Sequence, residues 1–96
     1  MDVRSLDEVR DNIDRLDRAI IALMAERGQF VEQAARFKTS RSDVEAPKRV
    51  AQVIAKVRGL AVEAGLEPQV AEAAYRAMIA AFIEVEHSAL ERGARP

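Results

Sequence analysis

Apolar residues recur at intervals of three and four along most of the chain, the spacing that places them on one face of an α-helix. The first such stretch runs from Ser5 to about Phe37 or Lys38, and its apolar positions are Leu6, Val9, Ile13, Leu16, Ile20, Leu23, Met24, Phe30, Val31, Ala34 and Phe37. Ser5 is a suitable N-cap, and Glu8 three residues later completes a capping-box pattern. The pattern predicts one long amphipathic helix, which Gly28 weakens without ending it.

Two shorter helices are predicted after a polar loop at residues 39–43. Pro47 suits the first turn of the second helix, which stops near Gly65, and the third begins around Pro68 and fades at Gly93. The apolar positions are Val50, Val53, Ile54, Val57, Leu60 and Ala61 in the second helix, and Val70, Ala74, Tyr75, Met78, Ile79, Phe82, Ile83 and Leu90 in the third. The sequence therefore predicts an all-α protein, with residues 1–96 forming a single domain of three helices.

The length of the first helix bears on assembly. About 33 residues at 1.5 Å each give a rod of roughly 50 Å. A compact monomer of this size has a diameter of only about 32 Å. Two shorter helices of the same chain cannot cover such a rod, so its apolar face requires a second copy. We therefore expect an intertwined helical homodimer.

Composition excludes several classes of protein. The 15 Lys and Arg residues balance 16 Asp and Glu residues, whereas a nucleic-acid-binding protein carries a basic excess. There is no cysteine and one histidine, His87, so we expect no disulfide, no thiolate chemistry and no metal site. No apolar run is long enough to span a membrane, and the charged start is unlike a signal peptide. These features predict a cytoplasmic protein.

Three cations on the predicted long helix are candidate ligands for an anion. Arg27 and Lys38 are 11 positions apart, which places them on one face of a continuous helix about 16 Å apart. Two such side chains can converge on a small dianion. Arg10 lies about 25 Å from Arg27 along the axis, so it can serve only the pocket of a partner chain in an antiparallel dimer. On spacing alone, three unrelated surface cations are the alternative.

Arg49 and Glu86 are further candidates outside the long helix. Arg49 opens the second predicted helix directly after the polar loop, where it can fold over a ligand or simply lie on the surface. Glu86 occupies an apolar stripe with Ile79, Phe82, Ile83 and Leu90. Apolar surroundings disfavour the charged form of a carboxyl unless a cation is near. The alternative for Glu86 is a residue at the edge of the stripe whose carboxyl reaches solvent.

Several segments in order resemble the all-helical chorismate mutases. They are residues 6–17 (LDEVRDNIDRLD), Glu26-Arg27 and residues 35–38 (ARFK). Residues 46–50 (APKRV) and 64–66 (AGL) are most similar to the subgroup that includes isochorismate–pyruvate lyases. The resemblance extends from about Leu6 to Leu90. It implies an intertwined dimer with two equivalent active sites for a dianion, chorismate or isochorismate.

The resemblance also implies a role for each candidate residue. Arg10 would reach a substrate carboxylate from the partner subunit, and Arg27 would bind a carboxylate in its own subunit. Lys38 would contact a carboxylate and the ether oxygen of the breaking bond, and Arg49 would support the carboxylate end. Glu86 stands where many members have a glutamine that donates to the ether oxygen, so a protonated Glu86 is expected to donate there.

The expected function is that of a chorismate mutase, which rearranges chorismate to prephenate in aromatic amino-acid biosynthesis. This intramolecular reaction requires no nucleophile, metal or cofactor. An isochorismate–pyruvate lyase that forms salicylate is the alternative, because two acidic positions of other mutases correspond to Ala46 and Val50 here, as in the lyase subgroup. A non-catalytic helical dimer is a third possibility, although packing alone does not explain cations on inward faces.

Overall fold

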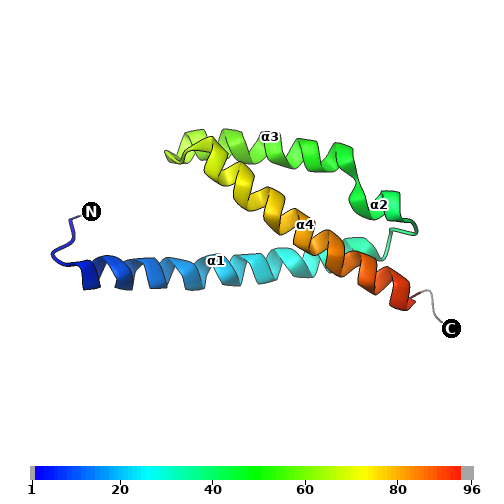
Figure 1. The fold of residues 1–96 in the computed structure, drawn as a ribbon, viewed down its shortest axis with the longest axis horizontal. Helices are drawn as coiled ribbons and strands as arrows, with labels where there is room; N and C mark the ends of the chain where they lie inside the picture. The colour runs from blue at the N-terminus through cyan, green and yellow to red at the C-terminus, as the bar shows by residue number, and fades with distance from the viewer. Residues whose placement is uncertain (1, 94–96) are drawn as a thin grey trace. The chain divides into compact units, whose positions relative to one another are not determined.

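A computed structural model describes residues 2–93, apart from the side chains of residues 41, 42, 90, 92 and 93. This part of the chain forms α1 (Leu6–Ala35), α2 (Arg41–Glu45), α3 (Pro47–Ala64) and α4 (Pro68–Gly93), and no strand (Figure 1). The predicted all-α fold, with a long helix followed by two shorter ones, is confirmed. The chain divides into two compact units, one reaching to Val31 and the other starting at Glu32.

The N-terminus of α1 is capped by side chains. The Ser5 hydroxyl accepts a hydrogen bond from the backbone N–H of Glu8 at 3.1 Å, as the predicted capping box requires. The Glu8 carboxylate accepts from the backbone N–H of Arg4 at 3.3 Å, one residue before the expected donor. These bonds satisfy backbone donors that have no partner within the helix and fix where α1 begins.

α1 ends at Ala35, two or three residues before the predicted end. The backbone N–H groups of Arg36, Phe37 and Lys38 bond to carbonyls three residues earlier, at 3.0–3.2 Å. Such bonds tighten the final turn of a helix and end its regular geometry. Lys38 therefore lies beyond the helix, and the prediction that Arg27 and Lys38 share one continuous helix face is wrong.

The predicted polar loop contains the short helix α2. Ser40 acts as its N-cap, because its hydroxyl accepts from the N–H of Asp43 at 3.2 Å. The Asp43 carboxylate in turn accepts from the N–H and hydroxyl of Thr39. Val44 is 3% exposed, and α2 packs against α4. The segment was expected to be irregular. It is helical because side chains cap it locally and because Val44 is buried.

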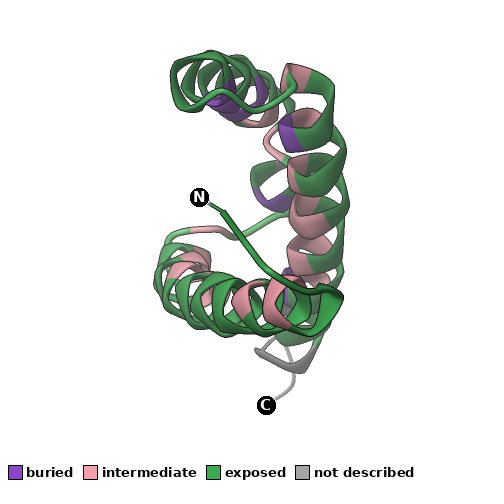
Figure 2. Ribbon diagram, turned by 90° about the vertical axis from the view of Figure 1, so that its left-hand side faces the viewer, coloured by how far each residue is buried: buried purple, intermediate pink, exposed green. Residues whose placement is uncertain are grey.

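α3 and α4 form a helical hairpin that contains the core of the second unit. Buried residues lie on both helices (Figure 2). The cluster consists of Val53, Val57, Ala61 and Ala71, with Tyr75 and Ile79 packed against it. Gly65 ends α3 in the left-handed conformation at φ 77°, and Leu66 N–H bonds to the Ala61 carbonyl at 2.8 Å. This is the glycine-terminated C-cap that the sequence predicts.

Ala46 joins α2 to α3 in a left-handed conformation, φ 38° and ψ 60°. An alanine in this region is destabilised by roughly 1–2 kcal/mol relative to a right-handed residue. Such a conformation persists only where the flanking structure imposes it. Here Pro47 begins α3 immediately afterwards, and Val44 holds α2 in place on the other side.

None of the helices described is both long enough and apolar enough to cross a membrane.

Candidate active site

Lys38 and Glu86 form the centre of the candidate site. Lys38 lies in the segment between α1 and α2, and Glu86 lies on α4. The Lys38 Nζ donates a hydrogen bond to Glu86 Oε2 at 2.8 Å. The Lys38 side chain is 24% exposed and that of Glu86 7% exposed. Two residues 48 positions apart are therefore brought into direct contact by the folding of the second unit.

The burial of Glu86 supports its predicted place in an apolar stripe. Glu86 is 6% exposed, while Ile79, Phe82 and Ile83 on the same helix are half-buried. The Leu90 side chain lies outside the described residues. The alternative that Glu86 reaches into solvent at the edge of the stripe is thus wrong. A carboxyl buried in this way requires hydrogen bonds or a cation, and the Lys38 ammonium supplies both.

The chemistry of this pair follows from its two protonation states. When the Glu86 carboxylate is ionised, the Lys38 ammonium neutralises its charge and uses one N–H to donate a hydrogen bond to it. With the carboxyl protonated, Lys38 and Glu86 each present an X–H donor at the same point. Two donors directed at one ligand atom stabilise negative charge that develops on it, particularly where water is excluded. The arrangement therefore suits an oxygen that gains charge during a reaction.

The other predicted site residues are distributed over both units. Arg10 is exposed and Arg27 half-buried, both on the part of α1 that belongs to the first unit. Arg49 is exposed in the first turn of α3, within the second unit. The structure thus brings together Lys38 and Glu86, and it leaves the contributions of Arg10, Arg27 and Arg49 to one pocket as a prediction.

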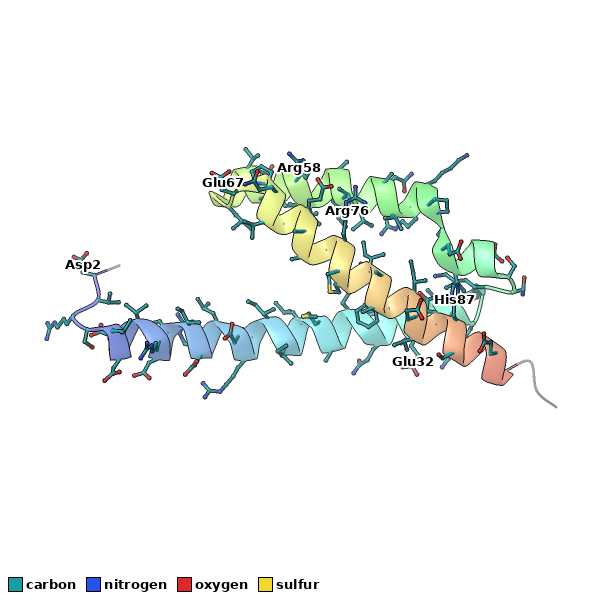
Figure 3. The ribbon with its side chains drawn as sticks, in the orientation of Figure 1. Asp2, Glu32, Arg58, Glu67, Arg76 and His87 are labelled. Carbon is teal, nitrogen blue, oxygen red and sulfur yellow. The ribbon has the colours of Figure 1, made fainter. Side chains whose placement is uncertain are left out.

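A second contact between α2 and α4 was not predicted from the sequence. His87 Nε2 lies 3.8 Å from Glu45 Oε2, and the imidazole is 11% exposed. The Nε2 atom is buried without a hydrogen-bond partner. Figure 3 labels His87 at the C-terminal half of α4, where α2 packs. The only available signal was that His87 directly follows Glu86 in the sequence.

The segment that carries Lys38 is held by Asp43. Hydrogen bonds from the Thr39 backbone, and also from Ser40 and the Thr39 hydroxyl, lower the pKa of Asp43 below its ordinary value, against a smaller opposing effect of desolvation. The ionised carboxylate is the form that accepts these bonds. Asp43 therefore ties the residue after Lys38 to α2 throughout the neutral range.

In the described part of the chain, no three His, Cys, Asp or Glu side chains come together as a metal ion would require. The site instead contains two pairs of a basic and an acidic side chain, Lys38 with Glu86 and His87 with Glu45.

Comparison with known proteins agrees with the resemblance noted in the sequence. The chain is 32% identical over 95 residues to the isochorismate pyruvate lyase of Pseudomonas aeruginosa (strain PAO1), an alignment that covers 97% of this chain and 94% of that protein. Residues 9–87 match the family described as chorismate mutase type II. That range includes every candidate site residue. The chain therefore belongs to the chorismate mutase type II family of enzymes.

Proposed function

We propose that this protein is a chorismate mutase that converts chorismate to prephenate. The observation that carries the proposal is the contact of Lys38 Nζ with the buried Glu86 carboxyl at 2.8 Å. The reaction breaks the ether C–O bond and forms a C–C bond within the same molecule, with no atom gained or lost. Negative charge grows on the ether oxygen as its bond to the ring breaks. Two donors at one point meet that requirement.

The site would act by conformational restriction as well as by electrostatics. Chorismate is a flexible dianion, and holding it in a compact reactive conformer removes much of the entropic barrier. Arg27 and Arg49 would bind carboxylates in the same subunit as Lys38, and Arg10 would bind one from the partner subunit. Arginine suits this role because its guanidinium pairs with a carboxylate through two parallel hydrogen bonds.

The dimer that this arrangement needs is supported by the exposure of α1. No residue of α1 is buried within the single chain, and none is marked as buried in Figure 2. Its exposed large apolar residues are Leu6, Ile13, Leu16, Ile20, Ile21, Leu23 and Phe30, each at least 45% exposed. Apolar patches of this extent mark interaction surfaces. A second copy of α1 would cover them and bring Arg10 to the partner's site.

An isochorismate–pyruvate lyase is the second candidate, favoured by the 32% identity to the Pseudomonas aeruginosa lyase. In that reaction the same type of C–O bond breaks, a ring hydrogen moves to the enolpyruvyl carbon, and salicylate and pyruvate form. Lys38 and Glu86 would serve the same ether oxygen. The third candidate is a helical dimer without catalytic activity. Such a function does not explain why a buried carboxyl is hydrogen-bonded to a lysine.

The two reactions are separated by their products. The purified protein is incubated with chorismate and, separately, with isochorismate. Prephenate is measured as phenylpyruvate after acid treatment, and salicylate by its fluorescence. Lys38→Ala tests the site, and Lys56→Ala, at an exposed lysine of α3, is the matched control. Prephenate as the dominant product, lost in Lys38→Ala and kept in Lys56→Ala, supports the proposal. Salicylate as the dominant product replaces it with the second candidate, and no product from either substrate refutes both.

A further inference from the structure

The contact between Glu45 and His87 lies next to the proposed catalytic pair. Its atoms are 3.8 Å apart, slightly beyond hydrogen-bond distance, and His87 Nε2 has no partner. A buried polar atom without a partner destabilises the structure that buries it. An imidazole that takes up a proton at this position gains a carboxylate partner that is already in place. The geometry is thus set for an ion pair that forms on protonation.

The contact spans two elements that also carry Lys38 and Glu86. His87 follows Glu86 on α4, and Glu45 is the last residue of α2. In the middle of α2, the Asp43 carboxylate accepts a hydrogen bond from the N–H of Thr39, the residue after Lys38. The position of α2 on α4 therefore governs where the Lys38 backbone lies relative to Glu86. An isolated helix of five residues has no stability in water, so α2 depends on such contacts.

The junction after α2 favours release of the segment. Ala46 holds a left-handed conformation that is unfavourable for alanine. If α2 separated from α4, Ala46 would be free to adopt an ordinary conformation. Docking of α2 thus requires contacts that offset this strain, and the burial of Val44 and the Glu45–His87 contact are two of them.

We infer that Glu45 and His87 form a proton-dependent latch that holds α2 on α4 and so positions Lys38 against Glu86. The latch is tight when His87 is protonated and loosens as the pH rises and the imidazole loses its proton. Its effect on catalysis rests on the proposed function, whereas the latch itself is a property of the free protein. Both residues are positioning residues, because they act through Lys38.

Other charged groups surround this imidazole. Glu84, Glu86 and Glu91 lie within four positions of it on α4, and α2 carries Asp43 besides Glu45. The segment between α1 and α2 carries Arg36 and Lys38, and α3 carries Lys48 and Arg49 in its first turn and Lys56 and Arg58 further along; the side chain of Arg41 lies outside the described residues. Among described side chains, Glu45 makes the ion-pair contact with His87. Substitution of Glu45 therefore removes the ion-pair partner of His87 and leaves the other nearby charges in place.

The test measures how often α2 opens, by NMR-detected amide hydrogen exchange in the free protein. The reporter is the Val44 N–H, which bonds to the Ser40 carbonyl at 3.2 Å. The reference is the Val57 N–H in the interior of α3. Protection of Val44 relative to Val57, corrected for intrinsic exchange rates, is compared at about pH 6 and about pH 8, a range in which histidine changes charge. The variants are Glu45→Gln, His87→Gln, the double variant and Glu63→Gln, an exposed carboxylate on α3.

We expect wild type and Glu63→Gln to show roughly two- to fivefold higher relative protection at the lower pH, the effect of a partly exposed ion pair. Glu45→Gln and His87→Gln should lose this dependence, and the double variant should resemble either single one. Added salt should weaken the dependence in wild type. If the relative protection of Val44 in Glu45→Gln depends on pH as it does in wild type, the latch is overturned. Because Glu45 is half-exposed, this variant remains informative even if His87→Gln does not fold.

Catalysis supplies a second, separate readout. If chorismate is the substrate, Glu45→Gln should lower kcat/KM at about pH 6 more than at about pH 8 and change kcat along with KM. A purely structural effect would lower activity equally at both pH values. An inactive wild type that still shows the exchange pattern refutes the proposed function and leaves the latch standing. An active enzyme whose exchange does not depend on pH refutes the latch alone.

Discussion

Lys38 and Glu86 are 48 positions apart in the chain, and their side chains meet at 2.8 Å with the carboxyl almost fully buried. A buried ion pair of this kind contributes little net stability, because desolvation of the two charges offsets their attraction. Removing one partner alone is destabilising, since it leaves the other charge buried without compensation. Such a pair is therefore better explained by a role in chemistry than by a role in folding.

The first prediction concerns the carboxyl of Glu86. In the proposed mechanism a protonated Glu86 would donate to the ether oxygen, whereas the ionised form would repel the charge that develops there. Glutamine carries a permanent N–H donor of similar shape, so Glu86→Gln should keep activity at neutral pH and show a flatter pH–rate profile. In wild type the rate should rise as the pH is lowered, until the fold fails. The measurement is kcat under saturating chorismate across the pH range in which both proteins remain folded.

Glu86→Ala provides the contrast, because it removes the donor without replacing it. Loss of a single donor to a developing oxyanion lowers kcat by on the order of 10²–10³-fold. Circular dichroism must show that this variant is helical, since it also leaves Lys38 without its partner. A rate for Glu86→Ala equal to that of wild type would show that Glu86 has no part in the reaction.

The starts of α1, α3 and α4 and the end of α3 were predictable because local side chains set them. Ser5, Pro47, Gly65 and Pro68 each mark an end of a helix by capping chemistry that depends only on neighbouring residues. α2 was missed because a five-residue helix is too short to show apolar periodicity. A signal for it exists, since Ser40 and Asp43 have the spacing of a serine cap and an acidic residue three positions later.

The candidate site was predictable only in part, for a different reason. Periodicity placed Glu86 among apolar residues, and burial confirms that position. Nothing in the periodicity indicated that its partner is Lys38, because that contact depends on the turn after α1 and on how the segment returns to α4. The family resemblance connected the two residues. The role of Arg10 depends on a second chain, so it stays a prediction.

The second prediction concerns pH and stability. Glu72 on α4 accepts hydrogen bonds from Arg76 at 2.7 Å and from Arg58 of α3 at 2.8 Å, and Figure 3 labels both arginines. These hydrogen bonds lower the pKa of Glu72 below its ordinary value of 4.5, and the bond from Arg76 has the larger effect. A carboxyl with a lowered pKa stabilises the fold at neutral pH, and this contribution is lost as the pH falls through the folded-state value.

Glu72→Gln should therefore be less stable than wild type at neutral pH, and the difference should shrink as the pH falls below about 4.5. Urea unfolding at several pH values measures it. Glu63→Gln, which removes the same charge from an exposed site on α3, is the control for net charge. A difference between wild type and Glu72→Gln that stays constant down to the acid limit would contradict the assigned bonds.

The third prediction compares two glycines of the α3–α4 hairpin. A Cβ added at Gly59 or at Gly65 meets no atom within 4 Å, so the two positions differ only in backbone conformation. Gly59 lies in the interior of α3, where alanine is favoured over glycine by about 1 kcal/mol. Gly65 is left-handed at φ 77°, where alanine is disfavoured by roughly 1–2 kcal/mol. Gly59→Ala should raise the free energy of unfolding, and Gly65→Ala should lower it.

The last prediction concerns a site shared between two chains. If Arg10 serves the partner's pocket, Arg10→Ala and Lys38→Ala should each form nearly inactive homodimers. Mixing them with exchange of subunits should restore activity, because in the heterodimer one pocket receives both defects and the other receives neither. Complete exchange of equal amounts yields half heterodimers by random pairing, so recovery should approach about a quarter of the wild-type rate, consistent with closed two-fold assembly.

Assembly must be measured in the same samples. Sedimentation equilibrium at micromolar concentration should show a dimer for wild type and both variants, because the apolar face of α1 is uncovered in a single chain. A pair of tags, one on each variant, allows the heterodimer to be isolated and assayed directly. The control mixture is Lys38→Ala with Glu86→Ala. Because Lys38 and Glu86 contact each other within one chain, every pocket in that heterodimer carries one defect, and no activity should return. No recovery in the isolated heterodimer of Arg10→Ala and Lys38→Ala would show that Arg10 does not act across the interface. Recovery in the control mixture would show that Lys38 and Glu86 of one chain do not serve the same pocket.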